Sequence, residues 1–209
     1  MRLLSDKLKL YLVLETKYLL MPLNDFLDEV LKGGVSTVQL RNKSQNIDDK
    51  LQCAYITREI TDKYGALFII NDNAELAEKV SADGVHIGVT DENPEIIRQK
   101  YSNMIIGYSC NNKDDVLTAN QYADYAGIGP YTETNTKKDH RQILGRQGIS
   151  NINSMLNIPA VAIGGINLDN AEDVFSSGVA GLAVSSFLCM SKKPYDDAKK
   201  LLEIINERV

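Results

Sequence analysis

The sequence predicts an α/β protein of the (β/α)8 or TIM-barrel class, with eight parallel strands inside a ring of outer helices. Two observations carry this prediction. Short apolar runs alternate with longer amphipathic stretches from one end of the chain to the other, which is the pattern of repeated strand–helix units and a parallel sheet. Eight such units share 209 residues. Each unit therefore has about 26 residues, enough for a short strand, a short helix and two tight loops.

A recurring motif favours a closed barrel over an open, flavodoxin-like sheet. The motif appears as Ala82-Asp83-Gly84-Val85, as Ala123-Asp124-Tyr125-Ala126 and, more loosely, as Val179-Ala180-Gly181-Leu182. Each copy begins just before an even-numbered strand. A closed barrel fills its interior in layers supplied by alternate strands, so an alternating signature suits closure.

The expected strands are short runs of apolar and β-branched residues. In chain order they are Leu10–Leu14, Thr37–Leu40, Leu67–Ile70, Gly84–Ile87, Met104–Tyr108, Tyr125–Ile128, Ala160–Ile163 and Gly181–Val184. The expected helices are the amphipathic stretches that separate and follow these runs. They lie near Leu23–Lys32, Ile47–Tyr64, Ala74–Val80, Pro94–Lys100, Lys113–Gln121, Ile149–Met155, Asn170–Ser176 and Pro194–Glu207.

Composition and charge are those of one ordinary globular domain over residues 1–209. Hydrophobic residues make up 44% and charged residues 24% of the chain, so a packed core is expected. The net charge of -5 argues against nucleic acid and anionic membrane surfaces as partners, because both require clustered positive charge. We expect small-molecule partners, and a homo-oligomer is left open.

The three cysteines, Cys53, Cys110 and Cys189, are widely separated and lack CxxC spacing, which predicts neither a disulfide framework nor a zinc site. Free thiols indicate a reducing compartment. The stretch before Leu10 mixes leucines with charges, and no apolar run reaches the length that spans a bilayer. The cytoplasm is therefore the expected location.

Polar residues at the expected strand ends are candidate site residues, because a barrel assembles its active site at the carboxyl ends of its strands. The second strand runs into Gln39-Leu40-Arg41-Asn42-Lys43, where alternation points Gln39, Arg41 and Lys43 to one side. Two cations and an amide suit a phosphate or diphosphate. The alternative is a solvated strand end whose charges face water.

Two carboxylates follow neighbouring strands. Asn71 and Asp72 come after the third strand, and Asp91 follows the fourth. A Mg2+ ion usually takes one or two carboxylates and completes its shell with substrate oxygens and water, so the pair predicts a magnesium site facing a diphosphate. The alternative is that Asp72 only caps the helix that begins near Ala74.

Small residues mark a second candidate anion site. Gly164-Gly165 follows the seventh strand, Ser185-Ser186 follows the eighth, and Ser109 supplies a hydroxyl at the end of the fifth. Glycines and small hydroxyl residues let backbone N–H groups approach a phosphate, although a Gly-Gly pair is also an ordinary turn. The chain thus offers one anion site with a metal at strands two to four and one without a metal at strands seven and eight.

The stretch 129–148 is too long for an ordinary connection and is polar, which predicts an active-site loop. His86 lies within the fourth strand and is interpreted as a hydrogen-bonded interior or rim residue rather than a catalytic base. No Ser/His/Asp order, HExxH or Walker sequence supports a hydrolase, a metalloprotease or a nucleoside triphosphatase.

Taken together, these residues resemble the thiamine-phosphate synthase (thiamine-phosphate diphosphorylase) family over nearly the whole chain. Segments that agree in order, spacing and strand position carry the resemblance. They are Val38–Lys43, Ile70–Asp72, Ala82–Gly88 with Asp91, Gly107–Ser109, Thr134–Asp139, Ile163–Ile166 and Ser185-Ser186. Asn42 departs from the family pattern, since many relatives have Glu there, and so do Tyr108 and Cys110 on either side of Ser109.

The family couples hydroxymethylpyrimidine diphosphate to hydroxyethylthiazole phosphate, or to its carboxylated tautomer, and releases diphosphate. The resemblance therefore implies a transferase with a Mg2+ cofactor and three groups of site residues. The implied ligands of the pyrimidine diphosphate are Gln39, Leu40, Arg41, Asn42, Lys43, Asn71, Ser109 and Lys137, of which Arg41, Lys43, Ser109 and Lys137 have catalytic roles. The implied ligands of the thiazole phosphate are Thr134, Asn135, Thr136, Gly165, Ser185 and Ser186. The implied metal ligands are Asp72 and Asp91.

Two other functions fit the same barrel. A thiazole tautomerase of this barrel family would bind thiazole phosphate but would need no diphosphate or metal site. His140 in the long loop favours this alternative. Retention of the residues for diphosphate and metal argues against it; these are Arg41, Lys43, Asp72, Asp91 and Lys137. A non-catalytic regulator that binds thiazole phosphate is the other alternative, because fold does not dictate function.

Overall fold

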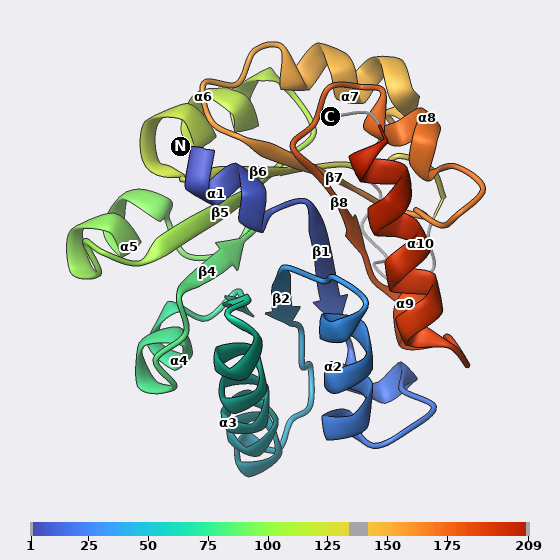
Figure 1. Cartoon of the computed structure of the whole chain (residues 1–209). Coiled ribbons are helices and arrows are strands. Elements are labelled where there is room, and N and C mark those ends of the chain that lie inside the picture. Colours follow the sequence, from blue (N-terminus) through green and yellow to red (C-terminus); the bar gives the residue numbers. More distant parts are fainter. Residues whose placement is uncertain (1, 134–141, 208–209) are drawn as a thin grey trace.

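The computed structural model describes residues 2–133 and 142–207 and shows a closed barrel of parallel strands in chain order (Figure 1). The first strand pairs with the second and also with the last, with Leu10 beside Leu182. The predicted (β/α)8 barrel is thereby confirmed. The strands are β1 (Leu10–Leu14), β2 (Thr37–Leu40), β3 (Leu67–Asn71), β4 (Gly84–Ile87), β5 (Ile105–Cys110), β6 (Tyr125–Ile128), β7 (Ala160–Ile163) and β8 (Gly181–Val184).

Helices surround the barrel (Figure 1). They are α1 (Arg2–Lys7), the 3-10 helix η1 (Thr16–Tyr18), α2 (Leu23–Lys32), α3 (Ile47–Tyr64), α4 (Ala74–Lys79), α5 (Pro94–Lys100), α6 (Lys113–Tyr122), α7 (Gly145–Asn153), α8 (Ala171–Phe175), α9 (Ser186–Cys189) and α10 (Pro194–Asn206).

Asparagines determine where several of these helices begin. The side chains of Asn46, Asn73, Asn93 and Asn112 each precede a helix and accept hydrogen bonds from backbone N–H groups of its first turn. These N–H groups have no partner within the helix, so a side-chain acceptor at this position stabilises the helix start. The helices therefore start close to the residues that the sequence predicts.

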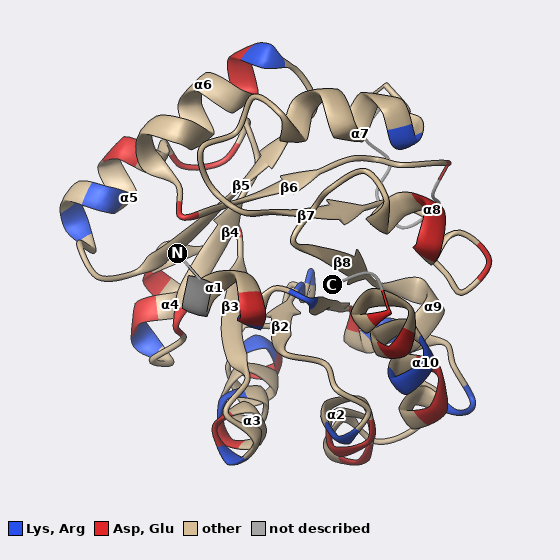
Figure 2. Ribbon diagram, turned by 45° about the horizontal axis from the view of Figure 1, so that its top comes forward, with Lys and Arg blue, Asp and Glu red and all other residues tan. Residues whose placement is uncertain are grey.

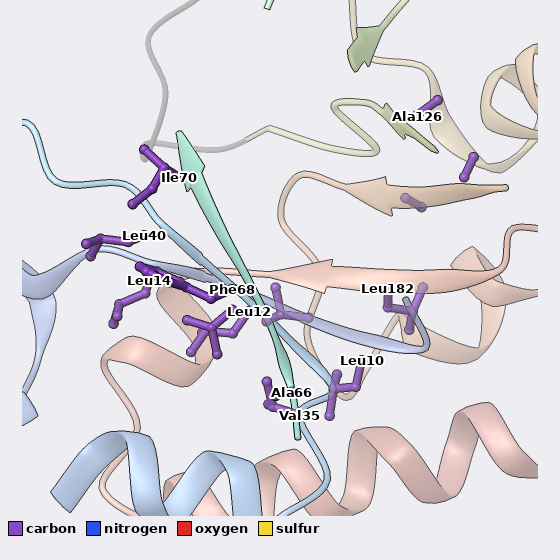
Figure 3. Packing of buried hydrophobic residues seen from close by; sticks show 14 of the residues in the cluster. Leu10, Leu12, Leu14, Val35, Leu40, Ala66, Phe68, Ile70, Ala126 and Leu182 are labelled. Carbon is purple, nitrogen blue, oxygen red and sulfur yellow. The ribbon is translucent and has the colours of Figure 1, made fainter. Parts of the chain in front are cut away.

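Alternation along each strand divides the core into two layers. In β1, Leu10, Leu12 and Leu14 pack in the layer between the strands and the helices, whereas Tyr11 and Val13 face the barrel interior. Figure 3 shows the side chains of Leu12 and Leu14 gathered with other apolar residues of the outer layer. This period of two decides which residues of every strand can reach the inside of the barrel.

The structure corrects several expected boundaries. The fifth strand starts at Ile105 rather than Met104 and continues to Cys110, because Ser109 and Cys110 pair with β6. The sixth expected helix, near Ile149–Met155, starts earlier, at Gly145, within the stretch predicted as a loop. Helices α1 and α9 were not expected, because each is too short to show a helical period in the sequence.

Charged residues lie mainly on the outer helices, where both signs are interspersed, and the strands are almost free of them (Figure 2). Within residues 2–133 and 142–207, no helix combines the length and the apolar character needed to cross a bilayer. The outer surface thus follows the usual division between an apolar core and a charged exterior.

Replacement of a buried helix leucine tests the outer layer of the core. Leu27 of α2 is 0% exposed, so Leu27→Ala removes packed methyl groups and leaves a cavity. We expect a loss of about 2–5 kcal/mol in the free energy of unfolding. Leu117 of α6 is 59% exposed and is the matched control. Leu117→Ala should change the same quantity by about 0.5 kcal/mol or less in urea unfolding. Equal effects of the two variants would contradict the packing described here.

Candidate active site

A cavity of about 1010 Å³ lies inside the barrel at the carboxyl ends of its strands. Every strand contributes to its lining, which includes Val13, Gln39, Asn71, His86, Ser109, Gly127, Ile163 and Ala183. The rest of the wall comes from residues that follow the strands. This is the end of the barrel where the fold collects functional groups from all eight strands.

Most of the predicted site residues meet at this cavity. Those that line it are Gln39, Arg41, Lys43, Asn71, Asp72, Asp91, Ser109, Gly165, Ser185 and Ser186. Four others, Thr134, Asn135, Thr136 and Lys137, lie outside the described residues, as does His140. The predicted active-site loop 129–148 is therefore described only at its two ends.

Leu40 and Asn42 do not join the cavity lining among the described residues. Leu40 is 3% exposed and packs in the outer layer of the core. The side chain of Asn42 accepts a hydrogen bond from the backbone N–H of Ser44 at 2.9 Å. Both residues alternate with Gln39, Arg41 and Lys43, so an inward position for those three turns Leu40 and Asn42 away. The resemblance implies Leu40 and Asn42 as ligands of the pyrimidine diphosphate, but their side chains are not part of the cavity lining, and their role in binding stays a prediction.

A buried carboxylate holds Arg41 at the cavity wall. Arg41 Nη1 donates to Glu15 Oε1 at 2.6 Å, and Lys17 Nζ lies 3.2 Å from Glu15 Oε2. The Glu15 side chain is only 2% exposed and that of Arg41 is 12% exposed. A partnered guanidinium with few free rotamers is well placed to hold an anion. The sequence analysis missed Glu15, although a carboxylate directly after the first strand was a signal of the same kind as Asp72.

The two aspartates lie together, next to the cations. Asp72 Oδ2 is 3.7 Å from Lys43 Nζ, and Asp91 Oδ2 accepts a hydrogen bond from the backbone N–H of Gly88 at 2.6 Å. Asp72 has a φ of 66°, a left-handed conformation that Asp tolerates better than most residues. The prediction that Asp72 caps the following helix is wrong, because Asn73 performs that role.

Electrostatics within this pair favour a bound cation. Partial burial, the negative charge of Asp91 and a hydrogen bond with Asp91 all raise the pKa of Asp72, while Lys43 and Arg41 oppose the rise. Within the described residues, no cluster of three or more His, Cys, Asp or Glu side chains could hold a metal ion. A pair of mutually repelling carboxylates beside an open cavity nevertheless fits Mg2+, which commonly takes one or two carboxylates and fills its other positions with substrate oxygens and water.

The other side of the cavity is built from small residues. Gly164 and Gly165 have φ values of 108° and 68°, and a Cβ on Gly165 would collide with the side chain of Thr132. The close turn therefore requires glycine at this position. Ser185 Oγ is buried here and has no hydrogen-bond partner among the described residues. A buried hydroxyl without a partner is costly, and a ligand oxygen in the cavity would satisfy it.

Buried polar side chains form the floor between these two sides. Tyr11 and Tyr125 are each 1% exposed, and their hydroxyl oxygens are 2.7 Å apart. Gln39 contacts Tyr11, and His86 joins Tyr125 to Ser109. The interpretation of His86 as a hydrogen-bonded interior residue is consistent with these contacts. The sequence analysis missed Tyr11 and Tyr125, although their inward positions on predicted strands could have been counted.

Comparison with known protein families agrees with this geometry. The family model described as thiamine monophosphate synthase matches residues 10–188. A thiamine-phosphate synthase of Methanococcus maripaludis is 38% identical over 206 residues, covering 98% of each chain. A thiamine-phosphate synthase of Bacillus cereus is 35% identical over 186 residues, covering 87% of this chain and 85% of the relative.

Solved structures extend the comparison to three dimensions. A thiamine phosphate pyrophosphorylase from Pyrococcus furiosus superposes with a TM-score of 0.90 at 33% identity and covers 98% of both chains. A 3-hexulose-6-phosphate synthase, at 14% identity and a TM-score of 0.66, shares the fold alone. With the family model matching most of the chain and its relatives similar over nearly their full length, this protein belongs to the thiamine monophosphate synthase family.

Proposed function

We propose that this enzyme joins hydroxymethylpyrimidine diphosphate to hydroxyethylthiazole phosphate, or to its carboxylated tautomer, and forms thiamine phosphate and diphosphate. The carboxylated substrate also loses its carboxylate as CO2. The thiazole nitrogen forms a bond to the pyrimidine methylene carbon, and the bond from that carbon to the diphosphate oxygen breaks. One observation carries the proposal. A single cavity has cations and paired carboxylates on one side, and on the other it has glycines and a buried serine hydroxyl without a hydrogen-bond partner among the described residues.

The cationic side would hold the pyrimidine diphosphate. Arg41 and Lys43 neutralise the charge that develops on the leaving diphosphate, and Glu15 keeps the Arg41 guanidinium oriented. Asn71 of β3 and Ser109 of β5 would be further ligands of this substrate. Lys137, predicted from the family resemblance to act on the same diphosphate, lies outside the described residues and stays a prediction.

Asp72 and Asp91 would hold Mg2+ at this side of the cavity. When bound, the ion supplies positive charge to the diphosphate oxygens and so favours departure of the leaving group. The carboxylates themselves hold this charge in place and separate it from Arg41 and Lys43. This arrangement accounts for two acidic groups within a site that otherwise attracts anions.

The glycine-rich side would seat the thiazole phosphate. Gly165 leaves room for phosphate oxygens close to the backbone, while Ser185 and Ser186 offer hydroxyl groups at the end of β8. Thr134, Asn135 and Thr136, which the resemblance also assigns to this substrate, stay predictions because they lie outside the described residues.

The reaction makes modest chemical demands on the protein. The exocyclic amine of the pyrimidine donates electron density to the methylene carbon as diphosphate leaves, so a carbocation-like species can form before the thiazole nitrogen captures it. Neither a strong base nor a protein nucleophile is required. The side chains lower the barrier by aligning two substrates and by stabilising the leaving group.

The activity itself is tested by incubating the purified protein with Mg2+ and both substrates. We expect thiamine phosphate and diphosphate to accumulate in equal amounts, because one of each forms per turnover. Product analysis by chromatography with mass detection measures both. A protein that only isomerises the carboxylated thiazole, or only binds thiazole phosphate, would overturn the proposal in favour of a tautomerase or a regulator.

The metal site is tested with Asp72→Asn. Asn tolerates the left-handed backbone of position 72 but loses the negative charge, so the fold is kept while the cation is held less tightly. We expect turnover at saturating Mg2+ to fall by about 100-fold or more. Calorimetric titration should show thiazole-phosphate binding unchanged. The control is Asp6→Asn, an exposed position on α1 at the opposite end of the barrel, which should keep full activity.

The proposed binding site for thiazole phosphate is tested with Ser185→Ala. This variant removes a buried hydroxyl that has no partner among the described residues, so we expect unfolding free energy to stay the same or rise. The KM for thiazole phosphate should rise by about tenfold through loss of one hydrogen bond to a charged group. Ser177→Ala is the control and should lower the unfolding free energy while leaving the KM unchanged. Its hydroxyl donates to Val174 O at 2.6 Å outside the cavity. An unchanged KM in Ser185→Ala would remove this residue from the site.

A further inference from the structure

A continuous chain of hydrogen bonds crosses the barrel interior beneath the candidate site. Gln39 Nε2 donates to Tyr11 Oη at 2.8 Å, and Tyr11 Oη lies 2.7 Å from Tyr125 Oη. Tyr125 Oη is 3.1 Å from His86 Nδ1, and His86 Nε2 is 3.0 Å from Ser109 Oγ. These side chains come from β2, β1, β6, β4 and β5, so the chain exists only in the closed barrel.

The amide at one end determines the direction of every following bond. Gln39 Nε2 can only donate, so the Tyr11 oxygen accepts there. The buried Tyr11 hydroxyl has one other polar contact among the described residues, the Tyr125 oxygen, so its proton finds an acceptor only by donating to Tyr125. Tyr125 then donates to His86 Nδ1. A neutral imidazole with an occupied acceptor at Nδ1 carries its proton on Nε2, and it therefore donates to Ser109 Oγ.

Burial keeps the hydroxyl groups of Tyr11 and Tyr125 protonated, so that each can donate a hydrogen bond to the next group. Tyr11 and Tyr125 lie in the barrel interior, and loss of hydration raises the pKa of both phenols far above its ordinary value. Each phenol therefore stays protonated and has one proton to donate. With one proton apiece, neither tyrosine can reverse its direction unless its neighbour reverses as well.

The two ends of this hydrogen-bond chain, Gln39 and Ser109, face the cavity with opposite hydrogen-bonding character. Gln39 and Ser109 both line the cavity. Gln39 Oε1 has no partner among the described residues and is an acceptor. Ser109 Oγ already accepts from His86, so its own proton is available to a ligand.

We propose that Tyr11, Tyr125 and His86 are positioning residues that set a one-way hydrogen-bond chain, which presents an acceptor at Gln39 and a donor at Ser109 to the pyrimidine substrate. The inference rests on the proposed function for the identity of that substrate. An aminopyrimidine complements these two ends, because its exocyclic amine donates and its ring nitrogens accept. The chain thereby selects one orientation of the ring, and with it the position of the methylene carbon that reacts.

The direction of the chain is tested without any substrate. The sequence contains two histidines, His86 and His140, so the imidazole nitrogens of uniformly 15N-labelled protein give few signals, and His140→Gln identifies those of His86. We expect His86 at neutral pH to be a single neutral tautomer with its proton on Nε2. A proton on Nδ1, a doubly protonated ring or a mixture of tautomers would overturn the proposal, whatever the catalytic activity of the protein.

The positioning role is tested with Tyr125→Phe, which keeps the ring and removes the central hydroxyl. We expect the KM for pyrimidine diphosphate to rise by about tenfold, with the KM for thiazole phosphate unchanged. His86 should also become a mixture of tautomers. A purely structural role would lower stability and leave both KM values as they are, and that result, or an equal rise of both, would contradict the proposal.

Two further variants complete the experiment. Tyr64→Phe removes a hydroxyl that donates to Asp28 at 2.8 Å among the outer helices, and this matched control should leave both KM values unchanged. Tyr11→Phe interrupts the hydrogen-bond chain one link earlier and should raise the KM for pyrimidine diphosphate in the same way. It takes the place of Tyr125→Phe if that variant fails to fold. Absence of synthase activity in the unmodified protein would refute the proposed function. The direction of the hydrogen-bond chain is tested separately, by the tautomer of His86.

Discussion

Pairing of the first strand with the last is the constraint on which the rest of the structure depends. Leu10 to Leu12 of β1 lie beside Leu182 to Val184 of β8, and this ladder turns a parallel sheet into a barrel. All strands are parallel and follow one another in chain order, so closure brings every carboxyl end to one rim. Groups that follow different strands then share a single cavity, and two substrates can meet there.

The barrel interior combines packing with polarity. Leu8, Val13 and Val161 pack in one cluster with the rings of the two buried tyrosines. The polar groups of the same interior satisfy one another, which offsets the cost of removing them from water. The same contacts restrict the side chains that face the cavity. A rigid, correctly oriented floor reduces the reorganisation that binding would otherwise require.

Positive and negative side chains at the rim of the barrel lie next to each other. Glu15 partners Arg41 from beneath, and Lys43 stands close to Asp72. The repulsion between Asp72 and Asp91 is relieved by a cation, while the cationic side chains are satisfied by an anion. The proposed metal-bound diphosphate would supply both at once. The Ser185 hydroxyl on the other side of the cavity has no hydrogen-bond partner within residues 2–133 and 142–207 and is suited to a second, separate anion.

The sequence alone determined the number of strand–helix units, nearly all strand limits and the polar groups at the strand ends. These features are local, because hydrophobic periodicity and capping residues act within a few positions of the chain. Only the tertiary structure decided that β5 extends to Cys110 and that Glu15 holds Arg41. It alone also joins Tyr11 to Tyr125. These contacts depend on the register and closure of strands that lie far apart in sequence, and no local pattern encodes which residues will meet across a barrel.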